Sequence, residues 1–283
     1  MEKKYKLTEE TITVGDKTLH RIEALKDFSD VKKGYKGGFI EKEENLSQSG
    51  DCWVYDDAMA FGNAAVCGNT IVRGDAMVYD NAEVYDDAKV FGNAQVCGNA
   101  RIYGDAKVYG KAEVFGDAMV YGNAKVYEDA RIYGNTKVYH NAAVFGDAIV
   151  YCDAKVYGNA MVYDNVKAFE DAEVFGNAEV FGNAEIRGNA EIASNSDYIV
   201  FKNWWSSGRY FTWTKSNNMW KVGCFYGTGE QLIEKAYKDS KSSGKEYKKV
   251  VDYVNSIKTN KYDRIRKNIK ERLLLKIRKL FGK

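Results

Sequence analysis

The chain has 283 residues, with 26 glycines and no proline, and 45% of its residues are hydrophobic. This composition excludes a wholly disordered chain, and no apolar run approaches the about 20 residues that cross a membrane. The net charge of +2 conceals a separation of charge, since residues 51–194 hold 11 basic and 22 acidic residues, whereas residues 258–283 hold 11 basic and two acidic ones. Such asymmetry is a signal for interaction partners.

The cellular compartment follows from the N-terminus and the cysteines. The first residues lack the apolar stretch of a secretory signal. The five cysteines are odd in number and have no C-x-x-C spacing, which argues against a disulfide framework and against a zinc site. We therefore expect a cytoplasmic protein.

Residues 1–50 are predicted to form an N-terminal hairpin or cap. Thr11–Val14 and Thr18–Ile22 read as two short strands joined by a Gly15-Asp16 turn. The segment through Phe39-Ile40 is expected to form a first, irregular coil.

Residues 51–194 consist of 24 six-residue units without an insertion. Position 1 is Asn or Asp in 23 units, position 2 is Ala in 20, position 4 is Val or Ile in 22 and position 6 is Gly in 15. Gly followed by Asn or Asp is typical of turns, because these residues tolerate positive φ. Each unit is therefore predicted to be a short strand followed by a turn.

Alternation within the strand assigns the two faces. Position 3 is often charged and must face water, and position 5, which is Tyr or Phe in 19 units, shares its parity. Positions 2 and 4 then point inward. One unit supports this assignment, because Val166 and Ala168 exchange the small and large inward residues and conserve core volume.

The V-x-G-N-A-x spacing of these 144 residues resembles the hexapeptide-repeat proteins, including bacterial transferases. That resemblance implies a left-handed parallel β-helix, with three hexads in each triangular coil and therefore eight coils. The segments Gly37–Ser47 and Asp197–Thr212 make the overall layout similar to uncharacterised hexapeptide-repeat proteins of gut bacteria and their phages.

The first five hexads carry apolar residues at the outward position 3, namely Trp53, Met59, Ala65, Ile71 and Met77. Something should cover these first coils. The N-terminal hairpin is the nearest candidate, and a second subunit is the alternative, in line with a homo-oligomer.

Residues 195–257 are predicted to form a small aromatic-rich α+β module. Strands are expected over 209–214 and 219–226, and helices over 229–240 and 245–258, opened by the capping boxes Thr228…Gln231 and Ser243…Glu246. The aromatic residues could form either the core of the module or a platform for a sugar, base or peptide. The candidate binding residues are Trp204, Trp205, Arg209, Trp213 and Trp220.

Residues 258–283 are predicted to form a basic tail, with an amphipathic helix over 261–283. An acidic protein surface, a membrane surface and nucleic acid remain open as its partner. The basic residues that would make this contact are Arg264, Arg266, Lys267, Lys270 and Arg272.

Catalytic chemistry finds little support in the residues. The resemblance implies acyl transfer with a histidine base, and His140 is the one candidate. This residue occupies a turn position, and the equivalent positions one coil away on each side are Gly122 and Gly158. No hexad is interrupted by a loop that could form a substrate pocket beside it. Two histidines exclude a three-histidine zinc centre, and paired acidic residues at corners read as solvated turns. We predict no metal and no cofactor.

The sequence therefore favours a non-catalytic structural or interaction protein that binds a macromolecular partner, expected to be a protein. An acyltransferase of the hexapeptide class is the first alternative. The second is a phage-type inhibitor that mimics nucleic acid or blocks a host defence protein.

Overall fold

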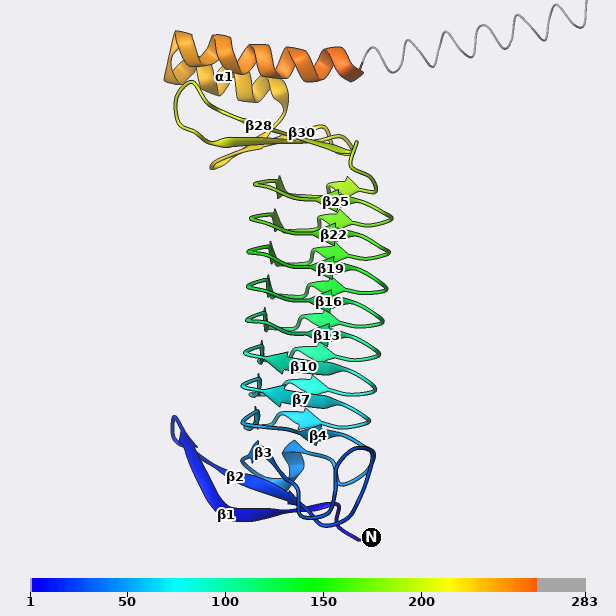
Figure 1. Cartoon of the computed structure of the whole chain (residues 1–283). Helices are drawn as coiled ribbons and strands as arrows, with labels where there is room; N and C mark the ends of the chain where they lie inside the picture. The colour runs from blue at the N-terminus through cyan, green and yellow to red at the C-terminus, as the bar shows by residue number, and fades with distance from the viewer. Residues whose placement is uncertain (1, 259–283) are drawn as a thin grey trace, which may run out of the picture. The chain divides into compact units, whose positions relative to one another are not determined.

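The computed structural model describes residues 2–258, which divide into two compact units at Gly223 and Cys224. This boundary falls within the predicted 195–257 module. The predicted basic helix, with Arg264, Arg266, Lys267, Lys270 and Arg272, lies outside the described residues. The first unit contains the repeats with a cap at each end of them (Figure 1).

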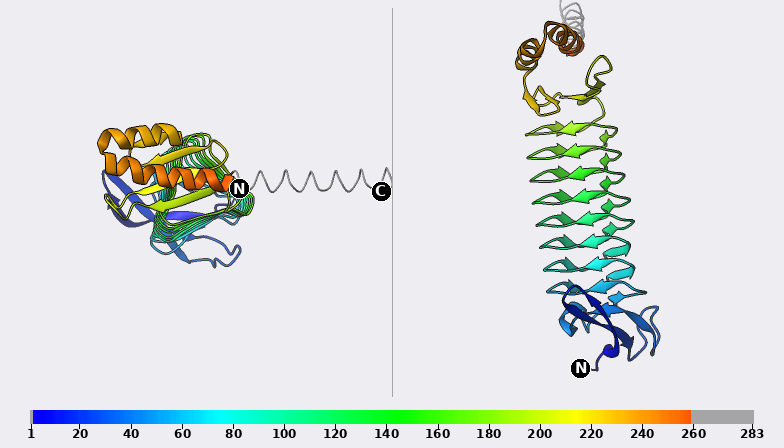
Figure 2. Two further views of the ribbon diagram at one scale, coloured as in Figure 1. Left: turned by 90° about the horizontal axis from the view of Figure 1, so that it is seen from above. Right: turned by 90° about the vertical axis from the view of Figure 1, so that its left-hand side faces the viewer.

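Each hexad forms one short strand and one turn, and the strands stack in parallel on three faces. Eight repeat strands lie on every face, as eight predicted coils require, and the coils superimpose when the stack is viewed from above (Figure 2). Face A comprises β5(Met59–Ala60), β8(Met77–Val78), β11(Gln95–Val96), β14(Glu113–Val114), β17(Arg131–Ile132), β20(Ile149–Val150), β23(Lys167–Ala168) and β26(Glu185–Ile186). Face B comprises β4(Trp53–Val54), β7(Ile71–Gly74), β10(Lys89–Gly92), β13(Lys107–Val108), β16(Lys125–Val126), β19(Ala143–Val144), β22(Met161–Val162) and β25(Glu179–Val180). Face C comprises β6(Ala65–Val66), β9(Glu83–Val84), β12(Arg101–Ile102), β15(Met119–Val120), β18(Lys137–Val138), β21(Lys155–Val156), β24(Glu173–Val174) and β27(Glu191–Ile192).

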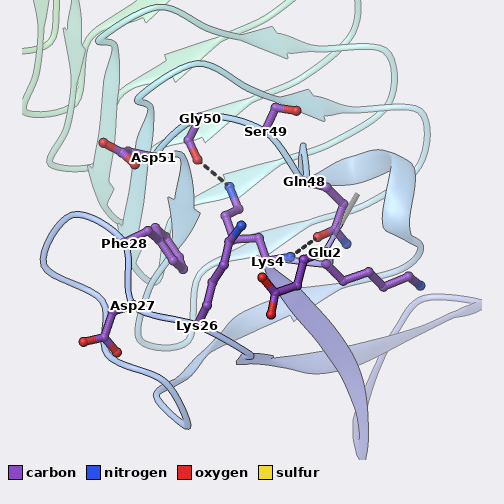
Figure 3. Close-up of a pocket in the computed structure, with 10 residues that line it drawn as sticks. Glu2, Lys4, Lys26, Asp27, Phe28, Gln48, Ser49, Gly50 and Asp51 are labelled. Atoms are coloured by element: carbon purple, nitrogen blue, oxygen red, sulfur yellow. Dashed lines mark hydrogen bonds between the residues drawn. The ribbon is translucent and has the colours of Figure 1, made fainter.

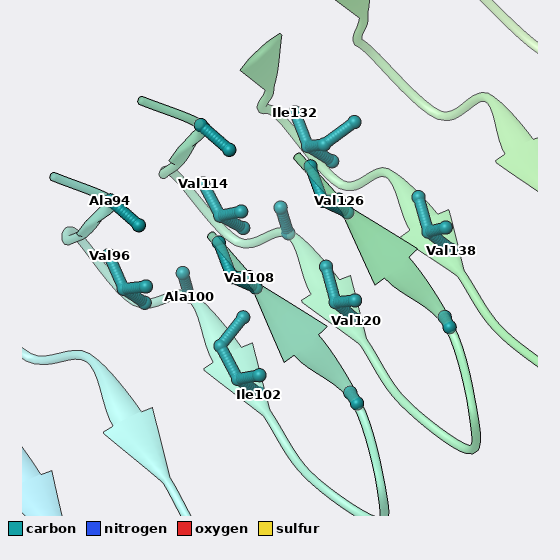
Figure 4. Close-up of a cluster of buried hydrophobic side chains, with 14 of the residues drawn as sticks. Ala94, Val96, Ala100, Ile102, Val108, Val114, Val120, Val126, Ile132 and Val138 are labelled. Carbon is teal, nitrogen blue, oxygen red and sulfur yellow. The ribbon is translucent and has the colours of Figure 1, made fainter. Parts of the chain in front are cut away.

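The core is a single column of small and branched side chains. Positions 2 and 4 point inward, as Figure 4 shows for Val108, Val114 and Val120, and nearly all of them are fully buried. Val166 and Ala168 are also both fully buried, so the exchange of small and large residues occurs inside the core as predicted. Burial of each valine contributes about 1.5–3 kcal/mol before entropy is subtracted.

Position 6 adopts a left-handed backbone in every hexad up to Gly188, whether glycine or another residue stands there. Glycines occupy it with φ near 70°, and His140 and Glu128 adopt φ of 60° and 61° at equivalent corners. A Cβ at Gly98 would come within 2.9 Å of the Gly116 nitrogen one coil further on. Glycine at these corners therefore relieves both backbone strain and crowding between coils.

The N-terminal cap continues face A. The hairpin β1(Tyr5–Val14) and β2(Lys17–Ala24) pairs with β3(Lys36–Ile40), which is parallel to β5, and the 3-10 turn η1(Glu43–Asn45) follows. The hairpin and the first irregular coil are thus where the sequence predicts them.

The N-terminal segment also covers part of the apolar outer surface of the first coils. Trp53 is fully buried between the edges of Tyr5 and Phe28, and Met59 packs on a cluster that contains Leu19. The prediction that the N-terminal cap covers the first coils is therefore confirmed at Trp53 and Met59, while Ala65, Ile71 and Met77 are half-buried.

At the other end of the stack, three antiparallel strands close the last coil: β28(Tyr198–Lys202), β29(Tyr210–Thr214) and β30(Met219–Val222). The sequence predicts β29 and β30 but not β28. The predicted strand over 219–226 is interrupted at Gly223 (φ 54°), after which β31(Phe225–Gly227) begins.

The second unit contains two helices. α1(Gly229–Asp239) begins at Thr228, whose hydroxyl accepts from the Gln231 N–H in the predicted capping box. The second helix starts at residue 241, four residues earlier than predicted, because the Ser240 hydroxyl accepts from the Ser243 N–H and takes the capping role assigned to Ser243. None of the helices among residues 2–258 is long and apolar enough to cross a membrane.

Candidate functional site

The five candidate binding residues of the terminal sheet do not form one platform. Trp213 and Trp220 face each other in register on β29 and β30 and are 4% and 2% exposed. The Trp213 indole N–H donates to Asn218 Oδ1 at 3.1 Å, and Trp220 stacks on Phe201 at 6.3 Å. These two tryptophans therefore belong to the core of the sheet.

The remaining three candidates lie on the connection between β28 and β29 or next to it. Trp204 is 84% exposed and meets Trp205 edge to face at 6.2 Å, and Trp205 packs against Phe211. Arg209 is exposed, and its carbonyl accepts from the Asn203 N–H at 2.7 Å. Trp204 is thus a single exposed ring beside a buried cluster.

His140 lies exposed at a corner between faces. Its ring meets the edge of Tyr139 at 4.8 Å, and no carboxylate of residues 2–258 forms an ion pair with it. A general base needs a partner that orients the ring and a pocket that brings substrate to it. The described hexads follow one another without a loop that could supply such a pocket.

The acidic corner residues have a structural role that the sequence did not suggest. Asp56, Asp86, Glu128 and Asp164 each accept from the backbone N–H of a glycine one coil further on, at 2.8–3.2 Å. They stabilise the stacking of coils. Among residues 2–258, no cluster of histidine, cysteine and acidic residues could hold a metal ion.

Outward-facing aromatic rings stack in columns along the three faces, and on face A Cys97 interrupts the column between Tyr79 and Phe115. On face B, the Phe91 and Tyr109 rings lie 4.7 Å apart and 3° from parallel, and Tyr109 and Tyr127 repeat the arrangement at 4.8 Å. Burial raises the pKa of Tyr109 above its usual range, and burial together with a hydrogen bond to Glu173 raises the pKa of Tyr157 to about 12. Because the ring faces are in contact with one another, the columns expose mainly ring edges.

A hollow of about 590 Å³ lies beneath the first coil, beside Lys3, Lys4 and Lys26 (Figure 3). Lys4 is 1% exposed, and its ammonium donates to the carbonyls of Gly50 and Cys52 at 3.2 and 2.9 Å. Burial lowers the pKa of Lys4. The lysine therefore serves to close the first coil rather than to face a ligand.

The outward position 3 of face B carries a feature that sequence reasoning missed. Lys89, Lys107 and Lys125 are direct register partners on three successive coils, and we call them the lysine ladder. None of the three forms an ion pair with any residue of 2–258. The signal was present in the sequence as lysine at an interval of 18 residues.

On the other two faces, several cations at the same outward position form ion pairs with register partners. On face C, Arg101 lies 3.7 Å from Glu83 and Lys155 lies 2.8 Å from Glu173, and on face A, Arg131 lies 3.6 Å from Glu113. Opposite charges on register partners stabilise a sheet, and like charges destabilise it. The lysine ladder is therefore the longest run of like charges in register on the solenoid, and face C has shorter runs at Lys137 with Lys155 and Glu173 with Glu191.

The six-residue repeats of this chain form a parallel β-solenoid, the architecture of the hexapeptide-repeat β-helix proteins. A family model described as the YdcK beta solenoid repeat matches residues 94–110. The chain is similar to the "Uncharacterized acetyltransferase YdcK" of Escherichia coli (strain K12), with 40% identity over 86 residues. This match covers 27% of the present chain and 26% of that relative, so the chain spans about a quarter of the relative's length.

Proposed function

We propose that the protein is a non-catalytic interaction protein whose solenoid binds an acidic protein partner along face B. The observation that carries the proposal is the lysine ladder. Three like charges in register cost stability in the isolated chain, and an acidic partner surface would reverse that cost. The adjoining turn carboxylates of Asp86 and Asp87 already accept from the Gly104 N–H and the Asn69 amide.

The rigidity of the solenoid supports the same proposal. The backbone ladder fixes the spacing of the three lysines, and the aromatic column beside them holds its rings 4.7–4.8 Å apart. A pre-organised row of charges loses little conformational freedom on binding. A nucleic-acid mimic would instead need a continuous acidic face, whereas face B presents cations.

The test uses poly-L-glutamate as the acidic probe, with binding measured by calorimetry and stability measured by thermal melting. Lys107→Glu places a carboxylate between two lysines. It should weaken binding by about tenfold or more while raising stability by about 0.2–1 kcal/mol through new cross-coil pairs. A loss of binding together with a gain of stability distinguishes a binding face from damage to the fold.

The matched control is Lys137→Glu on face C, which puts a carboxylate in register with Lys155. It changes the net charge by the same amount and should also raise stability, but it should leave binding within about twofold. Equal losses of binding in the two variants would mean that net charge alone governs the interaction, and the proposal would fail.

Acetyl transfer is the second candidate, because the relative from Escherichia coli is named as an acetyltransferase. His140 would be its base. Transfer from acetyl-CoA that falls about a hundredfold or more in His140→Ala would favour this candidate over the first. We also propose a cytoplasmic location, which the five free thiols support.

A further inference from the structure

The three aromatic columns end differently at the last coil. On face A, the Arg187 guanidinium lies over the last ring, Phe169, at 5.6 Å, and its Nε donates to Glu170 at 2.7 Å. On face C, Phe175 is the last ring, and the chain continues over it, since Ala193 takes the next register position. Two columns are therefore closed by this chain's own residues.

The column on face B ends openly at Phe181. β25 is the last strand of that face, and Phe181, which stacks on Tyr163 at 5.5 Å, is 46% exposed. A Cβ built on Gly182 would meet nothing within 4 Å, whereas at Gly158 it would meet the next coil at 3.0 Å. No further coil of the solenoid covers this ring.

A pocket of about 420 Å³ lies at this open end, a size usual for small-molecule sites. Phe181 contributes an exposed ring, and β28 and β29 supply Tyr198, Val200 and Tyr210. Tyr198 is fixed there, because its hydroxyl donates to the Glu179 carbonyl at 3.0 Å and accepts from the Phe181 N–H. The location is the junction of β25 with the terminal sheet (Figure 1).

The polar side-chain groups of the pocket are two carboxamides and the hydroxyls of Tyr198 and Tyr210. Asn195 accepts from the Glu179 N–H through Oδ1, which leaves its amide N–H groups without a partner in the described part of the chain. The Asn183 side chain likewise has no hydrogen-bond partner within residues 2–258. None of the residues that line the pocket is charged.

We propose that this pocket binds a neutral planar heteroaromatic ring of the nucleobase class, which would continue the aromatic column on the open face of Phe181. Stacking on an aromatic side chain accepts any such ring. A carboxamide matches the paired donor and acceptor groups on the edge of a base, as asparagine does with adenine. The absence of charge among the lining residues favours a base or nucleoside over a phosphorylated ligand.

The test measures adenosine binding to the full chain by calorimetry and by saturation-transfer NMR. Phe181→Ala removes the stacking surface and should weaken binding about tenfold or more. Asn183→Leu keeps the branched shape of the side chain but removes the amide, and should weaken binding several-fold. Thermal melting of each variant verifies that it is folded.

The matched control is Phe175→Ala, which removes the last ring of the closed column on face C and should leave adenosine binding within about twofold. Adenosine that does not bind, or that binds equally to Phe181→Ala and the unchanged protein, overturns the proposal. So does binding of glucose in place of adenosine, because a sugar needs no planar ring. None of these outcomes bears on the lysine ladder, so the two proposals fail separately.

Discussion

The two ends of the solenoid present backbone groups of opposite polarity. The N–H groups at hexad positions 3 and 5 donate to carbonyls of the following coil, as Met119 does to Thr136 and Tyr121 to Val138. The first coil therefore has carbonyls without a preceding coil, and the last coil has N–H groups without a following one. Buried backbone groups need partners, and an uncovered strand edge invites aggregation.

The N-terminal cap supplies donors. Besides the Lys4 ammonium, the Tyr5 hydroxyl donates to the Leu46 carbonyl at 2.6 Å, and the Asn45 amide donates to the carbonyls of Gly62 and Ala64 at 3.1 and 2.9 Å. All three side chains are buried.

The C-terminal cap supplies acceptors. The Glu179 N–H donates to Asn195 Oδ1 at 2.7 Å, and further N–H groups of the last coil meet oxygens of other side chains. These are Thr212 Oγ1 for Glu185, Ser216 Oγ for Glu191 and Asp197 Oδ2 for Ala193. Asparagine thus serves both ends, through its N–H groups at Asn45 and through its oxygen at Asn195. The polarity of the ladder, rather than the identity of the residue, decides which group is used.

The same substitution at the two ends should therefore have different outcomes. Asn45→Asp removes both donors and places a carboxylate against two carbonyls in a buried site, and should lower the free energy of unfolding by about 3–5 kcal/mol. Asn195→Asp keeps the accepting oxygen and should change the free energy of unfolding by less than about 1 kcal/mol. Denaturant unfolding measures both values.

A further variant tests whether the side chain of the exposed Asn195 contributes to stability at all. Asn195→Leu removes the acceptor and should cost about 1 kcal/mol, more than Asn195→Asp. If Asn45→Asp proves as mild as Asn195→Asp, the donor role of the N-terminal cap is wrong.

Removing one hydroxyl at each end should give intermediate and similar losses. Tyr5→Phe leaves the Leu46 carbonyl without its donor, and Thr212→Val leaves the Glu185 N–H without its acceptor. Each should lower the free energy of unfolding by about 1–3 kcal/mol. Thr212→Ser keeps the oxygen and should recover most of the loss. A Thr212→Val variant as stable as the unchanged protein would show that the sheet covers the last coil without capping it.

The coil interior could be predicted from the sequence because every hexad repeats the same physical problem. Alanine at position 2 and valine at position 4 together fit only a narrow core. The charged residues at position 3 determine which side of each strand is exposed to solvent. The exchange of small and large residues at Val166 and Ala168 supports this assignment from the sequence alone.

The caps could not be predicted in the same way, because each occurs once. Lys4 and Lys3 are adjacent and chemically equal in the sequence, yet only Lys4 reaches the first coil. Trp213 and Trp204 are both tryptophans of one aromatic segment, and only tertiary packing makes the first a core residue and the second an exposed one. The open column at Phe181 likewise depends on the face at which the repeat stops.

The smallest expected effects are those of pH, and they should also separate the two ends. Burial raises the pKa of Asp197, but hydrogen bonds from Lys215 and Ser194 outweigh burial, so that this pKa lies below its usual range. Its contribution to stability is therefore present above the unfolded pKa of about 4 and is lost as the pH falls through the lower folded value. Burial raises the pKa of Tyr5, so its contribution is complete below pH about 10 and is lost above it. Burial lowers the pKa of Lys4. The effect of this group on stability is therefore opposite to that of Tyr5, because its contribution increases as the pH rises toward 10.5.

Melting temperatures recorded against pH for single variants isolate each group by difference. Asp197→Asn should flatten the acid limb only, and Tyr5→Phe should flatten the alkaline limb only, because the stacked tyrosines and Lys4 remain in both proteins and cancel. Neither slope should exceed about 1.4 kcal/mol per pH unit, the limit for one proton. Asp147→Asn is the control for the acid limb, since this exposed turn residue makes no hydrogen bond or ion pair within residues 2–258 and should leave both limbs unchanged. The opposite result would be an acid limb that responds to Tyr5→Phe, or an alkaline limb that responds to Asp197→Asn. Either outcome would mean that the two ends do not titrate independently, and would contradict the division into a donor cap and an acceptor cap.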